Sequence, residues 1–103
     1  MVVVDNSQLV MERDAAIAEL RRARGAGSTE TVSEACQAER RVIRLRDAFI
    51  AALRENPQAS DVRRRLELTN MALSLIQGIE YPASGKPRDD LEEAANLLAE
   101  LLL

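Results

Sequence analysis

Three short breaks divide this 103-residue chain into four segments. They are the stretches GAGST at residues 25–29, ENPQASD at 55–61 and YPASGKP at 81–87. Proline lacks a backbone N–H and disfavours helical geometry in the residue before it, so the second and third breaks are the stronger ones. None of them is long enough to be a linker between domains. We therefore predict a single domain, residues 1–103, made of four consecutive elements.

The composition favours α-helix for all four segments. Ala, Leu, Glu and Arg dominate, and all four are good helix formers. Four glycines and three prolines leave too few turn residues for a fold rich in β-strands. We expect an all-α fold, a small four-helix bundle built on a central antiparallel helical hairpin, with helices over about 5–24, 29–55, 58–80 and 88–102. Asp89 followed by Glu92 has the spacing of a capping box at the start of the last helix, and Pro57 could begin the third helix with Asn56 as its cap.

The apolar residues of the two middle helices are arranged so that each helix must contact more than one neighbour. The third helix is apolar over more than half of its circumference, and we expect it to be the most buried of the four. The second helix has one apolar stripe that suffices for packing against the third. Its second stripe needs either the first helix or another protein chain, and contains Val32, Cys36, Ile43 and Ile50.

The C-terminal stretch LEEAANLLAELLL places many leucines on one helix face. A chain end is normally frayed and polar unless something holds it, and an exposed apolar patch marks a contact site. We therefore predict a partner or dimer interface at Leu98, Leu101 and Leu102, with Val32, Ile43 and Ile50 as a second candidate surface. The alternative is that the last helix packs back onto its own bundle.

Missing residue types argue against several kinds of chemistry. The chain has no histidine, which removes the commonest general base and the commonest neutral metal ligand. Cys36 is the only cysteine, so neither an intramolecular disulfide nor a cysteine-based zinc site is expected. We predict that Cys36 is a small core residue. Its unpaired thiol favours a protein of a reducing compartment, the cytoplasm. No segment has the 18 or more apolar residues of a membrane span. We expect no cofactor, no metal site and no membrane association.

The arginines raise the question of nucleic-acid binding, because Arg63, Arg64 and Arg65 are consecutive. Consecutive helix positions point about 100° apart, so these three cannot form one tight patch. The net charge of −3 comes from residues 82–103, which carry five acidic and two basic residues, while the rest of the chain is balanced. Such a distribution is unlike that of nucleic-acid binders, which carry a basic excess on one face. We predict solvated arginines paired with acids; contact with phosphate or with an acidic protein partner is the alternative.

An enzymatic alternative is a Mg²⁺-dependent all-α nucleotide hydrolase, in which helices present acids one turn apart. Glu30 with Glu34 and Asp89 with Glu93 have that spacing, but the typical E-E-x-x-E arrangement is absent. The Gly85–Lys86 pair lacks the earlier glycine of a phosphate-binding loop.

We therefore expect a non-enzymatic function. The prediction is a protein–protein interaction or self-association module, such as an adaptor, chaperone-like or accessory protein, that binds a protein partner or forms a homodimer. A nucleic-acid-associated regulator that uses the arginines of the second and third helices is the alternative.

Overall fold

The computed structural model describes residues 6–25, 28–78, 86–101 and 103. These residues form the helices α1 (Asn6–Gly25), α2 (Ser28–Glu55), α3 (Ser60–Gln77) and α4 (Lys86–Ala99). None of these helices is both long enough and apolar enough to cross a bilayer. The prediction of an all-α fold is confirmed, and each predicted helix corresponds to one observed helix.

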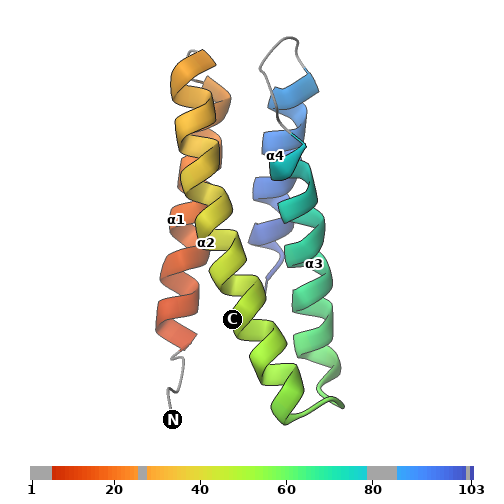
Figure 1. Ribbon diagram of the computed structural model, residues 1–103. Helices are drawn as coiled ribbons and strands as arrows, with labels where there is room; N and C mark the ends of the chain where they lie inside the picture. The colour runs from red at the N-terminus through yellow and green to blue at the C-terminus, as the bar shows by residue number, and fades with distance from the viewer. Residues whose placement is uncertain (1–5, 26–27, 79–85, 102) are drawn as a thin grey trace.

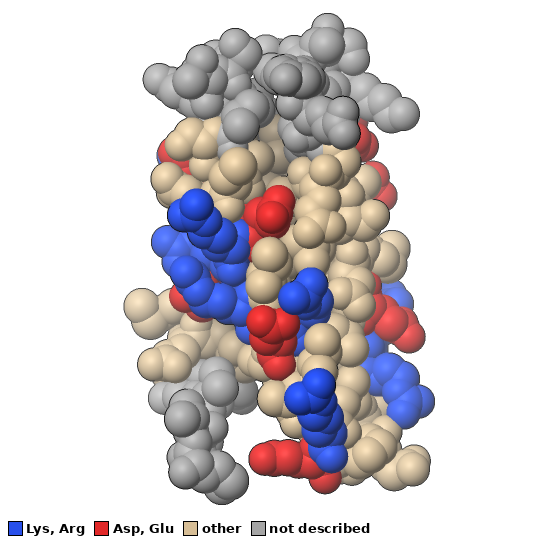
Figure 2. Space-filling view, viewed as in Figure 1, with Lys and Arg blue, Asp and Glu red and all other residues tan. Residues whose placement is uncertain are grey.

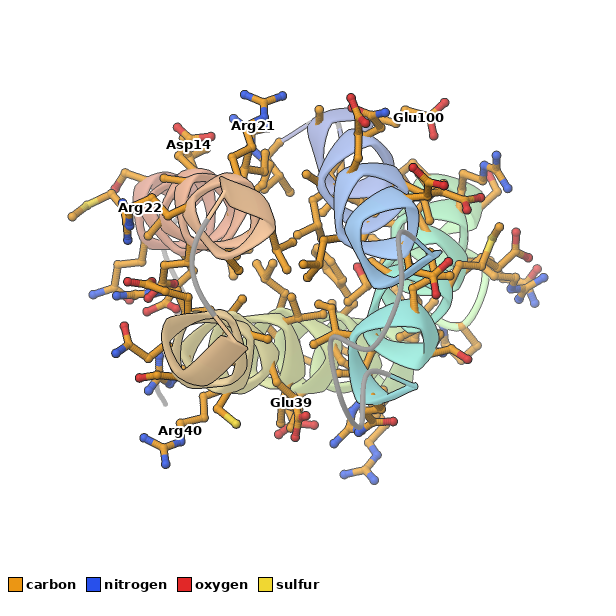
Figure 3. All side chains as sticks on the ribbon, turned by 90° about the horizontal axis from the view of Figure 1, so that it is seen from above. Asp14, Arg21, Arg22, Glu39, Arg40 and Glu100 are labelled. Carbon is orange, nitrogen blue, oxygen red and sulfur yellow. The ribbon has the colours of Figure 1, made fainter. Side chains whose placement is uncertain are left out.

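The four helices form a ring in which each one contacts two neighbours. Figure 1 shows them running alternately up and down, so that consecutive helices are antiparallel. α1 packs against α2 and α4, and α3 packs against the same two helices. Seen along the bundle axis, they occupy four corners (Figure 3). The predicted α2–α3 hairpin is therefore one side of an up-down-up-down four-helix bundle measuring 42 × 20 × 18 Å.

A tight turn after α2 determines where α3 begins. The Asn56 N–H donates to the Ala52 carbonyl at 3.0 Å, and the Ala59 N–H donates to the Asn56 carbonyl at 3.1 Å. The Asn56 side-chain oxygen accepts from the Gln58 N–H at 3.3 Å. Asn56 thus stabilises the turn through its own side chain, as asparagine often does. Pro57 lies within this turn, so it does not occupy the first turn of α3.

The bounds of α4 differ from the expected ones at both ends. The helix begins at Lys86, which places Asp89 inside its first turn, so the predicted capping role of Asp89 is wrong. The helix ends at Ala99, three residues earlier than predicted. The Glu100 N–H donates to the carbonyls of Asn96 and Leu97, both at 3.2 Å, and the Leu101 N–H donates to Leu98 at 3.1 Å. The chain therefore leaves α4 through a tightened final turn, which satisfies carbonyls that a helix end leaves unpaired.

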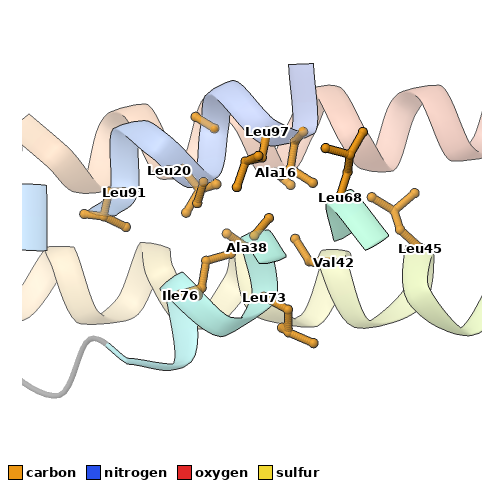
Figure 4. Close-up of a cluster of buried hydrophobic side chains, with 14 of the residues drawn as sticks. Ala16, Leu20, Ala38, Val42, Leu45, Leu68, Leu73, Ile76, Leu91 and Leu97 are labelled. Atoms are coloured by element: carbon orange, nitrogen blue, oxygen red, sulfur yellow. The ribbon is translucent and has the colours of Figure 1, made fainter. Parts of the chain in front are cut away.

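The core receives side chains from all four helices (Figure 4). Its large members include Leu20, Leu45, Leu73, Ile76 and Leu98, each at most 4% exposed. Burying each such side chain contributes about 1.5–3 kcal/mol. The alanines of the core are Ala16, Ala23, Ala35, Ala38, Ala72, Ala94 and Ala95. Their small size lets the helices approach closely.

Of the four helices, α4 has the largest fraction of buried residues, whereas the sequence predicted that α3 would be the most buried. α3 buries five of its 18 residues, and at least five of the 14 residues of α4 are buried. α4 is also the shortest helix, about 21 Å at 1.5 Å per residue, against about 42 Å for α2. Figure 1 shows α4 beside the upper part of the bundle, while the α2–α3 turn extends beyond it.

Candidate interaction surface on α1 and α2

The C-terminal leucines do not form the predicted interface. Leu98 is 0% exposed and Leu101 is 1% exposed, and both belong to the protein's own core. The prediction is wrong because α4 lies between α1 and α3, which cover its apolar face from two sides. Leu102 lies outside the described residues.

An arginine of α1 holds the residues that follow α4. Arg13 Nη1 donates to the Leu101 carbonyl at 2.8 Å, and Arg13 Nε donates to Asp14 at 3.0 Å. In the sequence Arg13 is a charged interruption of an apolar face. In the fold its guanidinium donates a hydrogen bond to a carbonyl just after the end of α4, where carbonyl groups have no backbone N–H partner.

The second predicted surface is only partly open to solvent. Ile43 and Ile50 are both half-buried, and Ile43 packs against the core. The side chain of Val32 lies outside the described residues. Cys36 is exposed, so the prediction that it is a core residue is wrong. The buried positions of α2 form a single stripe that includes Ala35 and Ala38, and Cys36 lies about 100° from Ala35 around the helix.

The three consecutive arginines have three different partners. Arg63 Nη2 donates to the Pro57 carbonyl at 2.7 Å. Arg64 pairs with Glu67 at 3.3 Å, and Arg65 approaches Asp61 at 3.8 Å. Arg64 and Arg65 thus pair with acids as predicted, whereas Arg63 donates to a backbone carbonyl instead of an acid. Such exposed pairs contribute little to stability.

A polar seam joins α1 to α2. Glu19 is only 2% exposed and accepts a 2.5 Å hydrogen bond from Arg41 Nε. The same guanidinium reaches Glu12 at 3.5 Å, and Arg44 Nη1 pairs with Glu12 at 3.1 Å. The hydrogen bond that Arg41 donates to Glu19 is the main cause of a raised pKa of Arg41; burial opposes the rise, and the charges of Glu19 and Glu12 reinforce it. Arg41 is therefore firmly charged.

The ion pairs also fix how α1 is aligned with α2. Arg44 pairs with Glu12 at 3.1 Å, and Arg22 pairs with Glu34 at 3.4 Å. Between these two pairs the residue number rises by ten in α1, from Glu12 to Arg22, and falls by ten in α2, from Arg44 to Glu34. This is the constant register of two antiparallel helices. It places Leu9 about level with Asp47.

An apolar groove lies between the first turns of α1 and the second half of α2. Its volume is about 660 Å³. It is lined by Gln8, Leu9, Met11, Glu12, Arg44, Asp47, Ala48 and Ala51. Met11 is 70% exposed, the highest exposure of any large apolar side chain described. Ala48 and Ala51 leave room above the α2 backbone, and the charged residues lie around them.

A smaller, charged recess lies beside the groove on the same two helices. Its volume is about 280 Å³, and it is lined by Glu19, Gln37, Arg40, Arg41 and Arg44. Arg44 lines both the groove and the recess. Figure 2 shows basic side chains gathered over the left side of the face turned to the viewer, with a mostly uncharged surface below them. Arg40 points away from the bundle (Figure 3).

The acids considered for a Mg²⁺ site do not gather in the described part of the protein. Asp89 and Glu93 are exposed on α4, and the side chain of Glu30 lies outside the described residues. Among the residues that the structure places, no three Cys, Asp or Glu side chains come together as metal ligands would.

Neither the groove nor the seam could be deduced from one helix at a time. The pair Glu19–Arg41 joins residues 22 positions apart, and the groove needs the relative placement of two helices. The available signal was indirect: at 100° per residue, Met11 lies on the far side of its helix from Ala16 and Leu20, which are buried.

The chain matches no protein-family model, and it has no significant match among curated proteins or solved structures.

Proposed function

We propose that this protein is a non-catalytic interaction module that binds another protein, or a second copy of itself, through the groove between α1 and α2. The observation that carries the proposal is the apolar groove, at whose edge Met11 is 70% exposed. Removing such a side chain from water favours association. Methionine suits a binding surface because its flexible thioether adapts to different partners.

The shape of the groove supports a helical partner. The two antiparallel helices α1 and α2 diverge toward this end of the bundle (Figure 1), and the groove lies between them there. An amphipathic helix inserts its apolar face into such channels, with anchors spaced three or four residues apart. The small side chains of Ala48 and Ala51 allow a close approach. The groove accommodates only a few anchors, which is typical of a transient interaction.

The proposal moves the contact surface from α4 to α1 and α2. The chain's own core already uses Leu98 and Leu101, while Leu9 and Met11 remain accessible at the groove. A reducing location such as the cytoplasm stays part of the proposal. It is supported by the exposed thiol of Cys36, which an oxidising compartment would leave open to intermolecular disulfides.

A selection of helical peptides from a display library tests the groove as the preferred binding surface. We expect selected peptides to lose binding to Met11→Asp and to Ala48→Arg. They should keep binding to Met71→Asp, the matched control, because Met71 is 50% exposed on α3, away from the groove. Circular dichroism of each variant checks that the helices are intact.

Self-association is tested on the same residues by NMR of methyl-labelled methionine. A homodimer through the groove predicts that the Met11 methyl resonance shifts with protein concentration, that the Met71 resonance does not, and that light scattering shows a rising mass. The proposal fails if peptides bind regardless of the groove substitutions and the Met11 resonance also stays constant.

Binding of generic duplex DNA at two salt concentrations distinguishes the nucleic-acid alternative. Counterion release predicts a steep loss of DNA affinity with salt. We expect no binding at either concentration, because Arg41, Arg44 and Arg64 are already paired with carboxylates.

A further inference from the structure

The groove and the recess form one continuous surface along α2. Arg44 lines both. The α2 residues that contribute recur every three to four positions, twice as an adjacent pair: Gln37, Arg40 with Arg41, Arg44, Asp47 with Ala48, and Ala51. That spacing places them on one helix face. From residue 37 to residue 51 this face is about 21 Å long, or about four helical turns.

The two ends of this surface differ in chemistry. At the groove end, Leu9, Met11 and the two alanines offer apolar contacts. The recess end is lined by Arg40, Arg41 and Arg44. Arg41 pairs with Glu12 and Glu19, and Arg44 pairs with Glu12. Arg40 is exposed and forms no hydrogen bond or ion pair with the residues that the structure describes. Arg40 is therefore the arginine of this recess that no carboxylate among the described residues pairs with.

We propose that this combined surface binds an acidic amphipathic helix of a partner protein. This inference rests on the proposed function and specifies the partner. The partner helix places large apolar side chains in the groove and carboxylates over Arg40, two to three turns away. Guanidinium groups suit carboxylates because their N–H donors match both oxygens.

Two other occupants fit this surface less well. α4 combines acids with leucines, but Leu91 and Leu98 are buried in the core, so a second folded copy cannot offer that apolar face. A nucleic-acid backbone would leave the apolar groove empty.

Synthetic helical peptides of about 16 residues, four to five turns long, test the inference. The acidic probe has two leucines one turn apart near one end and two glutamates two turns away. A basic twin has lysines in place of the glutamates, and an apolar-deficient twin has serines in place of the leucines. Each is made in both sequence orders, since the structure fixes no direction. Fluorescence anisotropy gives the affinity, and the Met11 methyl resonance reports the location.

We expect the acidic probe to bind about tenfold more tightly than its basic twin at low salt, since exposed charge pairs contribute a few-fold each. At about 0.5 M salt most of this difference disappears through screening. Arg40→Glu should abolish the preference for the acidic probe. Arg54→Glu, which changes an exposed arginine outside the recess, should leave it intact.

The outcomes separate this inference from the function on which it rests. Equal binding of the acidic and basic probes, with the Met11 resonance shifting in both cases, overturns the acidic partner and leaves the groove intact as a binding site. A preference that survives Arg40→Glu overturns the role of the recess. If leucines make no difference and the Met11 resonance does not move, both proposals fail.

Discussion

Two arginines each join distant parts of the bundle through hydrogen bonds that a solvated side chain would not form. Arg13 is 19% exposed at its side chain and donates to the Leu101 carbonyl. Arg41 is 33% exposed and bridges Glu12 and Glu19 on the neighbouring helix. Both are partly shielded from water, so their hydrogen bonds contribute more than those of fully exposed pairs.

Removing the Arg13 contact should loosen the residues that follow α4. Arg13→Ala is expected to lower the free energy of unfolding by about 1–2 kcal/mol, the range for a hydrogen bond to a charged group with partial exposure. Urea denaturation followed by circular dichroism measures this loss. Arg21→Ala is the control on the same helix, because Arg21 is exposed and should tolerate the change. Equal losses in the two variants would contradict the role of Arg13.

The ion pair at Arg41 should give a distinctive pH dependence when arginine is replaced by lysine. The raised pKa of Arg41 means that its stabilisation is fully present below its unfolded pKa and is lost only as pH rises through the still higher folded pKa. The pKa of a lysine side chain is much lower, about 10.4. We expect Arg41→Lys to be less stable by about 1 kcal/mol at pH 8 and the gap from wild type to widen as the pH rises above about 10, where the lysine begins to lose its charge.

Urea denaturation at a series of pH values measures that gap. Arg40→Lys is the matched control, since Arg40 is exposed beside Arg41, and its gap should stay near zero throughout. A gap for Arg41→Lys that does not change with pH would show that the charge of Arg41 does not stabilise the fold.

At the scale of the helices, the sequence predicted four helices and apolar faces on the second, third and last of them, but not which surface covers each face. Pro57 and the glycines mark the breaks, and the first apolar stripe predicted on the second helix corresponds to the buried Val42, Leu45 and Phe49 of α2. The same pattern could not reveal that α4 packs against its own chain, because an apolar face looks the same whichever surface covers it. Contacts such as Glu19 with Arg41 depend on tertiary register, which periodicity within one helix does not contain.

Burial of α4 predicts that its leucines stabilise the fold. Leu98→Ala should lower the free energy of unfolding by about 2–5 kcal/mol, because a fully buried leucine leaves a cavity when truncated. Leu103→Ala, at a half-buried position, should lower it by about 1 kcal/mol. Leu98→Asp should lose its helical circular dichroism signal. A stable, helical Leu98→Asp monomer would contradict the burial of this position.

At the scale of the whole molecule, α4 closes the ring. It contacts α1, the first helix, and α3, and so joins the two ends of the described chain. Without α4, the side chains of Leu20 and Leu73 would be partly exposed to solvent, since both lie in the core that all four helices share. A small bundle has little stability to spare, commonly about 5–15 kcal/mol.

A chain that ends after Gly85 should therefore fail to fold cooperatively. We expect it to bind the dye ANS and to show no sharp urea transition, because its apolar faces are uncovered. Adding a peptide of residues 86–103 in trans should restore helicity and reduce dye binding. The ring-closing role of α4 is refuted if the shortened chain unfolds as sharply as the full one.

The short α4 leaves the two ends of the bundle unequal. Leu101 is held by Arg13, and the α1–α2 register puts Arg13 about level with Ile43, so the stretch of α2 around Ala48 and Ala51 extends past the last turn of α4. Amide hydrogens near the α2–α3 turn should exchange with solvent through small openings that spare the other end. A helix bound in the groove would hold the first turns of α1 against the second half of α2. Its binding would be visible as slower amide exchange at that tip, some distance from the bound residues themselves.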